Sequence, residues 1–340
     1  MAADGAKPPV LQAFGNAKVV CQGWYWAAAS RALRIKQVLG LELMGRSIVL
    51  YRGVDGVARA RDAFCPHMGA HLSLGRVEGN GLRCFFHGWR FDQAARCDHV
   101  PALDGEARPQ VQLRSHPLVE KDGLIWIWVG DGSPSVPAPH HPQLDECERA
   151  HFVAAQWTKG CHPNVVLINA IDEHHFRTVH AMPGEALAFV TASISPLQFR
   201  VTNTAAPPAI NLFWRLISQL YPDRVLAYEI NYFSGATGTV SFGPAWMRMH
   251  LMFATRLGPN GQSEGVTVAL TKRRTGVFGW LLTPVVLGLS ALGGAYFALG
   301  DTKVFNTIRF DLKTPIPADK TVMAFVRHVE AQPRAAGWRS

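Results

Sequence analysis

The sequence predicts an α+β protein in two parts, an all-β domain followed by a larger domain in which strands are mixed with a few helices. Short β-rich runs separated by turn residues fill the chain up to residue 132. A segment with four prolines then interrupts this pattern at residues 131–142. Beyond it, strand-like and helix-like stretches follow one another, which is typical of an α+β domain.

The first domain is predicted at residues 18–132, after an N-terminal extension of residues 1–17. Its strand candidates are rich in aromatic and β-branched residues and are bounded by turn residues, as expected for a small antiparallel domain. These candidates lie at residues 47–53, 81–92 and 123–131.

The second domain is predicted at residues 143–335, and residues 133–142 form the linker because of their proline content. One helix is expected at about residues 164–181, which precedes most of the strands. The strand candidates of this domain lie near residues 196–203, 226–233, 249–256, 266–272 and 321–329.

The composition indicates a globular protein. The 340 residues are 48% apolar and 17% charged, which is too hydrophobic for a disordered chain. The net charge of +9 comes from basic residues that are scattered rather than gathered on one stretch, so we expect no nucleic-acid partner.

Six cysteines are too few for a disulfide scaffold, and the N-terminus lacks the apolar run of a signal peptide. We therefore expect a cytoplasmic protein.

One segment, Thr275–Gly300, contains no charged residue and directly follows the basic cluster Lys272-Arg273-Arg274. It is long enough to cross a bilayer. Pro284 and several glycines interrupt it, which favours a broken or closely packed helix that is buried or lines a pocket. A peripheral membrane contact is the second interpretation, and a true span is the third.

A first group of metal-ligating residues has the pattern C-x-H-x16-C-x2-H and consists of Cys65, His67, Cys84 and His87. Two thiolates and two imidazoles can hold a 2Fe–2S cluster in which histidines replace two cysteines on one iron. The same four ligand types can also hold a structural zinc ion.

The surrounding residues separate these alternatives. CPHMGAHL at 65–72 and CFFHGWRF at 84–91 closely resemble the two cluster-binding loops of Rieske proteins. This resemblance implies that the two cysteines hold one iron and the two histidines hold the other. The sequence departs from the family where Met68 replaces a frequent arginine and Phe85 replaces a frequent proline. His71 and His99 lie nearby but do not fit the ligand spacing.

A second group lies in NAIDEHHFRTVH at residues 169–180, which contains D-x2-H-x4-H. Asp172, His175 and His180 resemble the mononuclear iron motif of Rieske non-haem oxygenases. On a regular helix the two histidines would lie about 140° apart, so the helix must contain a π-bulge or a break between them. We expect Asp172 beside the ligands, and His174 to point elsewhere.

Two histidines need a carboxylate to complete the facial triad that binds non-haem iron. In the family this ligand lies far downstream, and Asp301 fits best because an apolar helix-like run surrounds it. Asp311, in an expected strand, and Asp319, in a proline-rich turn, are weaker candidates.

The resemblance covers residues 18–330 and implies the oxygenase component of a Rieske non-haem iron oxygenase. It implies a Rieske domain, a helix-grip catalytic domain, a 2Fe–2S cluster and a mononuclear Fe(II) that activates O2. It also implies a homotrimer in which Asp172 passes on the electron from a neighbouring subunit's cluster. The chain has no dinucleotide fingerprint, so electrons from NAD(P)H must arrive through a separate ferredoxin or reductase.

The substrate is expected to be an apolar or aromatic small molecule, because the second half of the chain is rich in large apolar residues. They include Trp214, Phe233, Trp246, Met247 and Trp280. We expect monohydroxylation, while demethylation, desaturation and oxidative cyclisation use the same iron site. Two other classes stay open, a Rieske electron carrier without catalysis and a lipid-binding module with a vestigial iron site.

Overall fold

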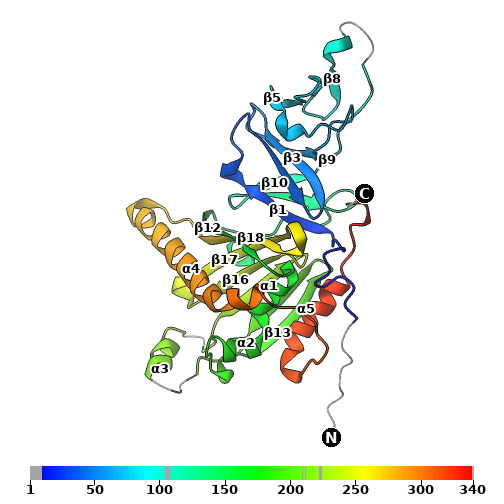
Figure 1. The fold of residues 1–340 in the computed structure, drawn as a ribbon. Helices are drawn as coiled ribbons and strands as arrows, with labels where there is room; N and C mark the ends of the chain where they lie inside the picture. Colours follow the sequence, from blue (N-terminus) through cyan, green and yellow to red (C-terminus); the bar gives the residue numbers. More distant parts are fainter. Residues whose placement is uncertain (1–9, 104–107, 209, 211, 222–223, 339–340) are drawn as a thin grey trace. The chain divides into compact units, whose positions relative to one another are not determined.

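The computed structural model describes residues 10–338 apart from 104–107, 209, 211 and 222–223 (Figure 1). The chain divides into two compact units, which are described separately below. The smaller unit comprises Trp24–Ala138 and Ala336–Ser340, and the larger comprises Met1–Gly23 and Pro139–Ala335. The change of unit after Ala138 lies inside the linker predicted at 133–142.

Where the structure describes it, the smaller unit contains three antiparallel sheets. The first has the strand order β1 (Gly23–Ala29), β11 (Leu124–Val129), β10 (Leu118–Lys121). The second has the order β2 (Val38–Leu43), β3 (Arg46–Arg52), β4 (Ala58–Asp62), β9 (Ser115–His116). The third has the order β5 (Arg76–Glu78), β6 (Gly81–Arg83), β7 (Arg90–Phe91), β8 (Cys97–His99). The three predicted strand regions fall on β3, on β6 with β7, and on β11.

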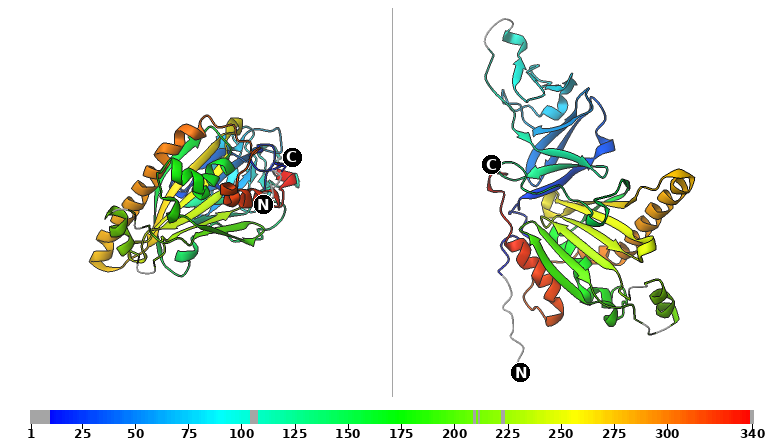
Figure 2. Two further views of the ribbon diagram at one scale, coloured as in Figure 1. Left: turned by 90° about the horizontal axis from the view of Figure 1, so that it is seen from below. Right: turned by 180° about the vertical axis from the view of Figure 1, so that it is seen from behind.

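The larger unit is built on one seven-stranded antiparallel sheet (Figure 2). Its strand order is β12 (Arg149–Lys159), β18 (Ser263–Lys272), β17 (Met249–Leu257), β16 (Thr237–Phe242), β15 (Tyr228–Phe233), β14 (Gln198–Asn203), β13 (Phe189–Ser195). The six strands β13 to β18 follow one another in chain order as antiparallel neighbours, and β12 pairs with β18 at the edge of the sheet. The first strand of this sheet along the chain therefore pairs with the last one.

Among the described residues of this unit, five helices accompany the sheet: α1 (Pro163–Ile168), α2 (Glu173–Thr178), α3 (Leu212–Gln219), α4 (Gly276–Phe305) and α5 (Lys320–Glu330). The main core lies where α1 and α5 meet the strands, with Ile171, Val201, Phe325 and Val326 fully buried in it. The α+β class is therefore confirmed. The more specific helix-grip arrangement remains a prediction.

Short 3-10 helices connect these elements. They are η1 (Ser30–Ala32), η2 (Leu72–Leu74), η3 (Pro101–Leu103), η4 (Pro142–Leu144), η5 (Asn169–Ile171), η6 (Gly184–Ala186), η7 (Ala245–Met247), η8 (Pro259–Gly261), η9 (Pro317–Asp319) and η10 (Ala336–Trp338). Of these, η5 matters most for the site, because it separates α1 from α2 within the region predicted as one helix at 164–181.

Two further expectations are wrong. Residues 321–329 form α5 rather than a strand, because their buried side chains recur with the helical period, at positions 321–323, 325, 326, 328 and 329. Asp311 lies in irregular chain after α4 rather than in a strand. The β-branched residues in both segments favoured strands, but tertiary packing overrides such local propensities.

The helix α4 is continuous through Pro284, so the expected break is absent, whereas the close packing expected as its alternative occurs at Gly294, which lies against Leu251. Pro284 lies on the exposed side, where the carbonyl group left without its N–H partner can meet solvent. Residues Gly279–Phe305 are long and apolar enough to cross a membrane, yet only 22% of their most apolar window is buried. Most of this helix therefore faces outward instead of lining a pocket.

Candidate metal centres

Two loops of the smaller unit carry the first predicted ligand group. Cys65 follows β4 and Cys84 follows β6, and each cysteine is held by backbone hydrogen bonds within its own loop. Cys65 N donates to Ala70 O at 2.9 Å, and Cys84 N donates to Trp89 O at 2.8 Å. Each loop has a glycine with φ near +70° four residues after its cysteine, Gly69 at +72° and Gly88 at +69°. The two loops thus share one backbone shape.

The two loops bury their thiols and expose their imidazoles. Cys65 and Cys84 are 3% and 2% exposed, whereas His67 and His87 are exposed, with ring centroids 4.6 Å apart. Trp89 stacks on His67 at 4.6 Å with an interplanar angle of 10°. This arrangement provides an inner pair of sulfur ligands and an outer pair of nitrogen ligands, as a cluster with two distinct irons requires.

Burial raises the pKa of the Cys65 thiol to about 11, and the neighbouring Cys84 adds to this effect. The Cys65 thiol therefore keeps its proton unless a metal ion displaces it, because a metal deprotonates the thiol that ligates it. Two buried thiols next to each other therefore suit the sulfur ligands of an iron–sulfur cluster in this position.

The remaining residues of these loops have other roles. His71 caps the short helix η2, since its Nδ1 accepts from Ser73 N at 3.2 Å and lies 2.6 Å from Ser73 Oγ. Met68 and Phe85, the two departures from the family pattern, are 67% and 73% exposed. Both side chains therefore face solvent and are not part of the buried surroundings of the thiols.

The second ligand group begins at the helix α2. Asp172 caps this helix, since its Oδ1 accepts from the His175 backbone N–H at 3.0 Å. The helix ends at Thr178, so His180 lies on irregular chain and its ring turns back toward His175. The break required by the five-residue spacing is therefore present at the helix end. His174 is exposed.

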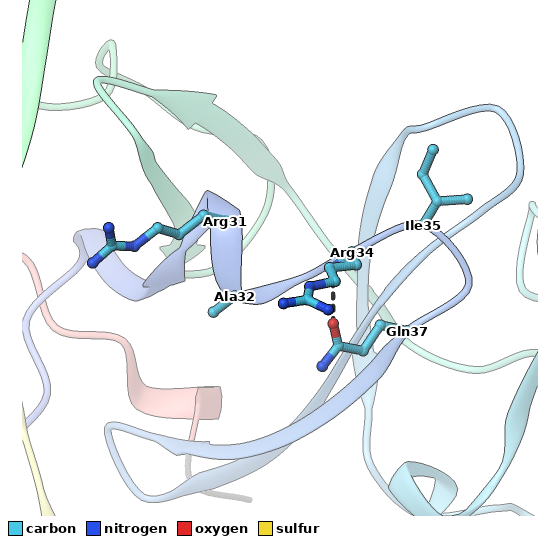
Figure 3. A pocket seen from close by; sticks show the side chains of 5 residues that line it. All are labelled: Arg31, Ala32, Arg34, Ile35 and Gln37. Carbon is cyan, nitrogen blue, oxygen red and sulfur yellow. Dashed lines mark hydrogen bonds between the residues drawn. The ribbon is translucent and has the colours of Figure 1, made fainter.

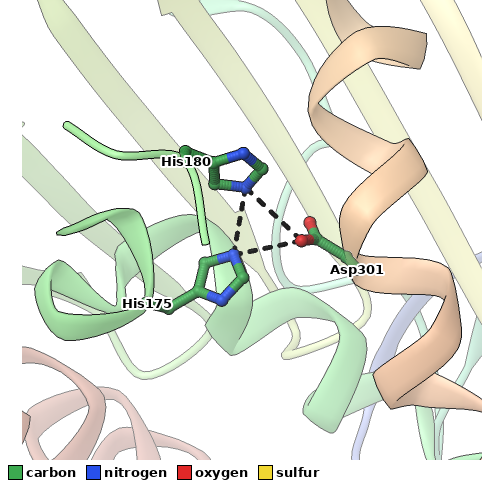
Figure 4. A group of neighbouring side chains, drawn as sticks. All are labelled: His175, His180 and Asp301. Carbon is green, nitrogen blue, oxygen red and sulfur yellow. Dashed lines mark hydrogen bonds and ion pairs between the residues drawn. The ribbon is translucent and has the colours of Figure 1, made fainter. Parts of the chain in front are cut away.

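His175, His180 and Asp301 meet in one place, with all their ligand atoms within 4.8 Å of one another (Figure 4). The two Nε2 atoms are 3.1 Å apart. Asp301 Oδ1 lies 3.1 Å from His175 Nε2 and 3.4 Å from His180 Nε2. Asp301 comes from α4, 121 positions after His180, so only the packing of α4 on the sheet brings it here.

The three groups suit a metal ion. Asp301 is 6% exposed, and its Oδ1 is buried without a hydrogen-bond partner although it faces both imidazoles. Burial also lowers the pKa of His180, against the opposing effect of the Asp301 carboxylate, and so favours the neutral imidazole that ligates metals. Two histidines and one carboxylate on one side match the ligand set of non-haem Fe(II).

The other carboxylates proposed for this role lie elsewhere. Asp311 is exposed and forms a 2.8 Å ion pair with Lys313. Asp319 accepts from Ile316 N at 2.8 Å and caps the start of η9. Each carboxylate thus has a local structural partner.

Asn169 is a residue of this site that sequence reasoning missed. Its Nδ2 donates to Asp301 Oδ2 at 2.6 Å and lies 3.0 Å from His175 Nε2. It stands three residues before Asp172, at the start of the same motif, and a polar residue in that position could have been noticed. Asn169 therefore orients the carboxylate whose other oxygen faces the imidazoles.

The surroundings of His180 are aromatic. Its ring lies 5.7 Å from the Phe176 ring and 5.2 Å from the Phe297 ring. Phe176 continues into a buried cluster with Phe189 and Tyr228, at ring distances of 6.3 and 6.0 Å. An apolar molecule would find apolar partners on this side of the triad.

The large apolar residues predicted near the substrate are dispersed. Phe233 is 6% exposed, Met247 is half-buried and Trp280 is 76% exposed on α4. The side chains of Trp214 and Trp246 lie outside the described part of the structure. Their abundance in the sequence therefore does not identify a pocket.

A separate hollow lies on the smaller unit, lined by Arg31, Ala32, Arg34, Ile35 and Gln37 (Figure 3). Gln37 Oε1 accepts from Arg34 N at 2.9 Å and closes the loop on itself. No residue predicted as a ligand lines this hollow, so it carries no part of the site.

Comparison with known families identifies the smaller unit. Residues 23–117 match the family described as "Rieske [2Fe-2S] domain". A cholesterol 7-desaturase (nvd) of Bombyx mori is 29% identical over 316 residues, covering 89% of this chain and 67% of the relative. A 4beta-methylsterol monooxygenase of Methylococcus capsulatus is 32% identical over 157 residues, covering 45% of this chain and 42% of the relative.

Solved structures resemble the whole chain. A dicamba monooxygenase bound to dicamba superposes with a TM-score of 0.61 at 20% identity, covering 94% of this chain and 97% of that one. NdmA of Pseudomonas putida CBB5, solved with caffeine, gives a TM-score of 0.66 at 16% identity, covering 89% and 88%. At such identities the likeness concerns the fold.

Proposed function

Because this chain belongs to the Rieske non-haem iron oxygenases, we propose that it is an oxygenase component that oxidises an apolar small molecule with O2 and electrons from NAD(P)H. The observation that carries the proposal is the group of His175, His180 and Asp301, assembled in the same chain as two Rieske-type loops. A Rieske electron carrier needs no second iron site, so this group favours an enzyme.

The cofactors are a Rieske 2Fe–2S cluster and a mononuclear iron. In our assignment Cys65 and Cys84 hold the inner iron of the cluster, and His67 and His87 hold the outer iron. The burial of the thiols and the exposure of the imidazoles support this assignment. The side of the two exposed imidazoles is the natural entry for an electron, because a partner protein can approach it from solvent.

In the catalytic unit His175, His180 and Asp301 would hold the mononuclear iron, which supplies the activation of O2. The protein's own part is to keep these three ligands on one side and to leave the opposite side free for reactants. Asn169 holds Asp301 Oδ2, so that Oδ1 stays directed at the two imidazoles. Phe176 and Phe297 exclude water from the His180 side.

Asp172 is proposed as the residue through which an electron arrives from a neighbouring subunit in a homotrimer. It contacts the backbone of His175 and is half-buried, so it can reach both the ligand and a partner surface. A separate ferredoxin or reductase would deliver the electrons. We place the protein in the cytoplasm.

For the substrate we propose a molecule with an apolar polycyclic skeleton, such as a sterol. Two relatives of this chain are named for reactions on cholesterol and on a 4β-methylsterol, and a third is a 3-ketosteroid-9-alpha-monooxygenase of Rhodococcus rhodochrous. The aromatic surroundings of His180 support an uncharged substrate. We propose monohydroxylation, with desaturation as the second candidate because the relative that aligns over 89% of this chain is named a desaturase.

The test combines reconstituted protein, a surrogate ferredoxin and reductase, NADH and a panel of sterols and small aromatic acids. Under 18O2, mass spectrometry should show one labelled oxygen in a sterol product, or the loss of two hydrogens if the reaction is a desaturation. His175→Ala protein that retains its cluster is the control and should form no product. Turnover of aromatic acids with none of the sterols would overturn the proposed substrate class, and no turnover of either would overturn the enzymatic role.

A further inference from the structure

The helix α4 presents an uninterrupted apolar surface to the outside. Its exposed residues recur every three or four positions and so lie along one side of the helix. We call this row the outer stripe: Val277, Leu281, Val285, Leu289, Leu292, Tyr296 and Leu299, each between 44% and 75% exposed. A surface of this size is unusual on a protein that has no partner for it.

The opposite side of α4 is packed on the sheet. Val286, Leu287, Ser290 and Gly294 are buried, and Leu287 shares a cluster with Leu251 and Ala269 of β17 and β18. Gly294 lies so close to the sheet that an added Cβ would be 2.8 Å from Leu251 Cδ1. A helix held in this way cannot be surrounded by lipid, so α4 cannot span a bilayer in this fold.

The charges around α4 favour an anionic surface. Lys272 and Arg273 are exposed directly before the helix, and Lys303 is exposed near its end. Between Thr275 and Gly300 no charged residue occurs. Trp280, 76% exposed near the start, and Tyr296 have the amphipathic rings that settle at the headgroup level of a membrane.

A second helix of the same unit has the same character. Leu212, Leu216 and Leu220 lie four residues apart in or next to α3 and are 72%, 55% and 38% exposed. In all three views α3 protrudes on the same side of this unit as α4 (Figures 1 and 2). Two apolar helices on one side can contact one planar surface together.

We propose that the outer stripe of α4 docks the protein on the surface of an anionic lipid bilayer, with the helix lying in the membrane plane. Protein interfaces contain about one hydrogen bond per 100–200 Å². The outer stripe offers one hydroxyl group, that of Tyr296, and otherwise hydrocarbon, which suits lipid better than a second protein. The basic residues at the start of α4 add attraction to anionic headgroups.

The docked helix also carries part of the iron site. Phe297 contacts His180, and Asp301 follows one turn later, both on the other side of α4 from the outer stripe. Docking itself does not depend on which reaction the iron catalyses.

The test is flotation of the purified holoprotein with vesicles of phosphatidylcholine, with and without phosphatidylglycerol. Wild-type protein should float with the anionic vesicles. Leu281→Glu/Leu292→Glu should reduce the bound fraction at least about tenfold, since charges on a membrane-facing apolar surface are strongly unfavourable. Lys272→Glu/Arg273→Glu should remove the preference for anionic lipid and its salt dependence.

A matched control is Val190→Glu/Ile194→Glu on β13, where both residues are exposed at 56% and 45% but lie away from the outer stripe. This variant should float like wild type, and all variants should keep the cluster absorbance. Equal loss in the control and the α4 variant would contradict the proposal, as would wild-type protein that does not float. If wild type ignores vesicles and Leu281→Glu/Leu292→Glu splits a larger assembly in sedimentation, a second copy covers the stripe and lipid docking is wrong.

Discussion

Asn169 donates a 2.6 Å hydrogen bond from its side-chain amide to Asp301 Oδ2, a residue 132 positions further along the chain. The same amide nitrogen lies 3.0 Å from His175 Nε2, so one side chain touches two of the three groups proposed to bind iron. Such contacts fix the orientation of ligands, and their loss typically lowers metal affinity about 10–100-fold.

We therefore expect Asn169→Ala to lose mononuclear iron during dialysis while the cluster spectrum stays unchanged. The reason is that Asp301 can rotate once its Oδ2 partner is gone. Iron titration followed by electron paramagnetic resonance measures the affinity, and the Rieske signal of the same sample serves as the internal control. Wild-type affinity in the variant would show that Asn169 has no positioning role.

Asp301→Ala should lower the iron content from about three to about two atoms per chain, because it removes one ligand of the mononuclear site only. Asp311→Ala is the matched control, since Asp311 is exposed and paired with Lys313. Atomic emission on protein of known concentration gives the count. Loss of iron in the Asp311 variant instead would mean that another carboxylate completes the triad.

Cys84→Ser should abolish the red-brown colour of the cluster, because an alkoxide replaces thiolate poorly at iron. His175→Ala should show the reverse behaviour, with a normal visible spectrum and no product. Visible absorbance and product analysis on both variants distinguish the two centres. A coloured Cys84 variant, or a His175 variant with full turnover, would contradict the respective assignment.

Two buried histidines predict acid sensitivity. Burial lowers the pKa of His141 to about 4 and that of His250 to about 3, and their rings lie 4.5 Å apart. In the unfolded chain both histidines take up a proton near pH 6.5, whereas in the folded state they stay neutral to a lower pH. The contribution of the two neutral histidines to the free energy of unfolding is therefore full above pH 6.5. It is lost as the pH falls toward 4, at about 1.4 kcal/mol per pH unit for each histidine.

The urea midpoint of wild type should therefore fall between pH 6.5 and 4.5, and it should fall less steeply in His250→Gln. His174→Gln is the control, because His174 is exposed and should leave the slope as in wild type. Equal slopes in all three proteins would show that these buried histidines do not control the acid response.

The local parts of both metal centres could be predicted from the sequence. Cys65 with His67, and Cys84 with His87, are close along the chain, so a single turn decides how each pair is presented. The same holds for His175 and His180, whose spacing required a helix break that the structure places after Thr178. The assignment of these residues as ligands is still to be tested by the variants above.

The relative positions of residues that are close along the chain could be predicted, because turns and helix ends depend on neighbouring backbone groups. The class of the fold followed from hydrophobic patterns for the same reason. Residues 321–329, which lie within the helix α5, were predicted as a strand, because their β-branched residues are typical of strands when packing is ignored.

Only the tertiary structure decided the contacts between distant segments. The sequence named Asp301 by its surroundings, but the packing of α4 on β17 and β18 brings it to the histidines and to Asn169. The same packing turns the uncharged segment outward, where the sequence favoured a pocket wall. A helix that is apolar all round can bury any of its sides, and the shape of the sheet surface, with Gly294 against Leu251, selects which one.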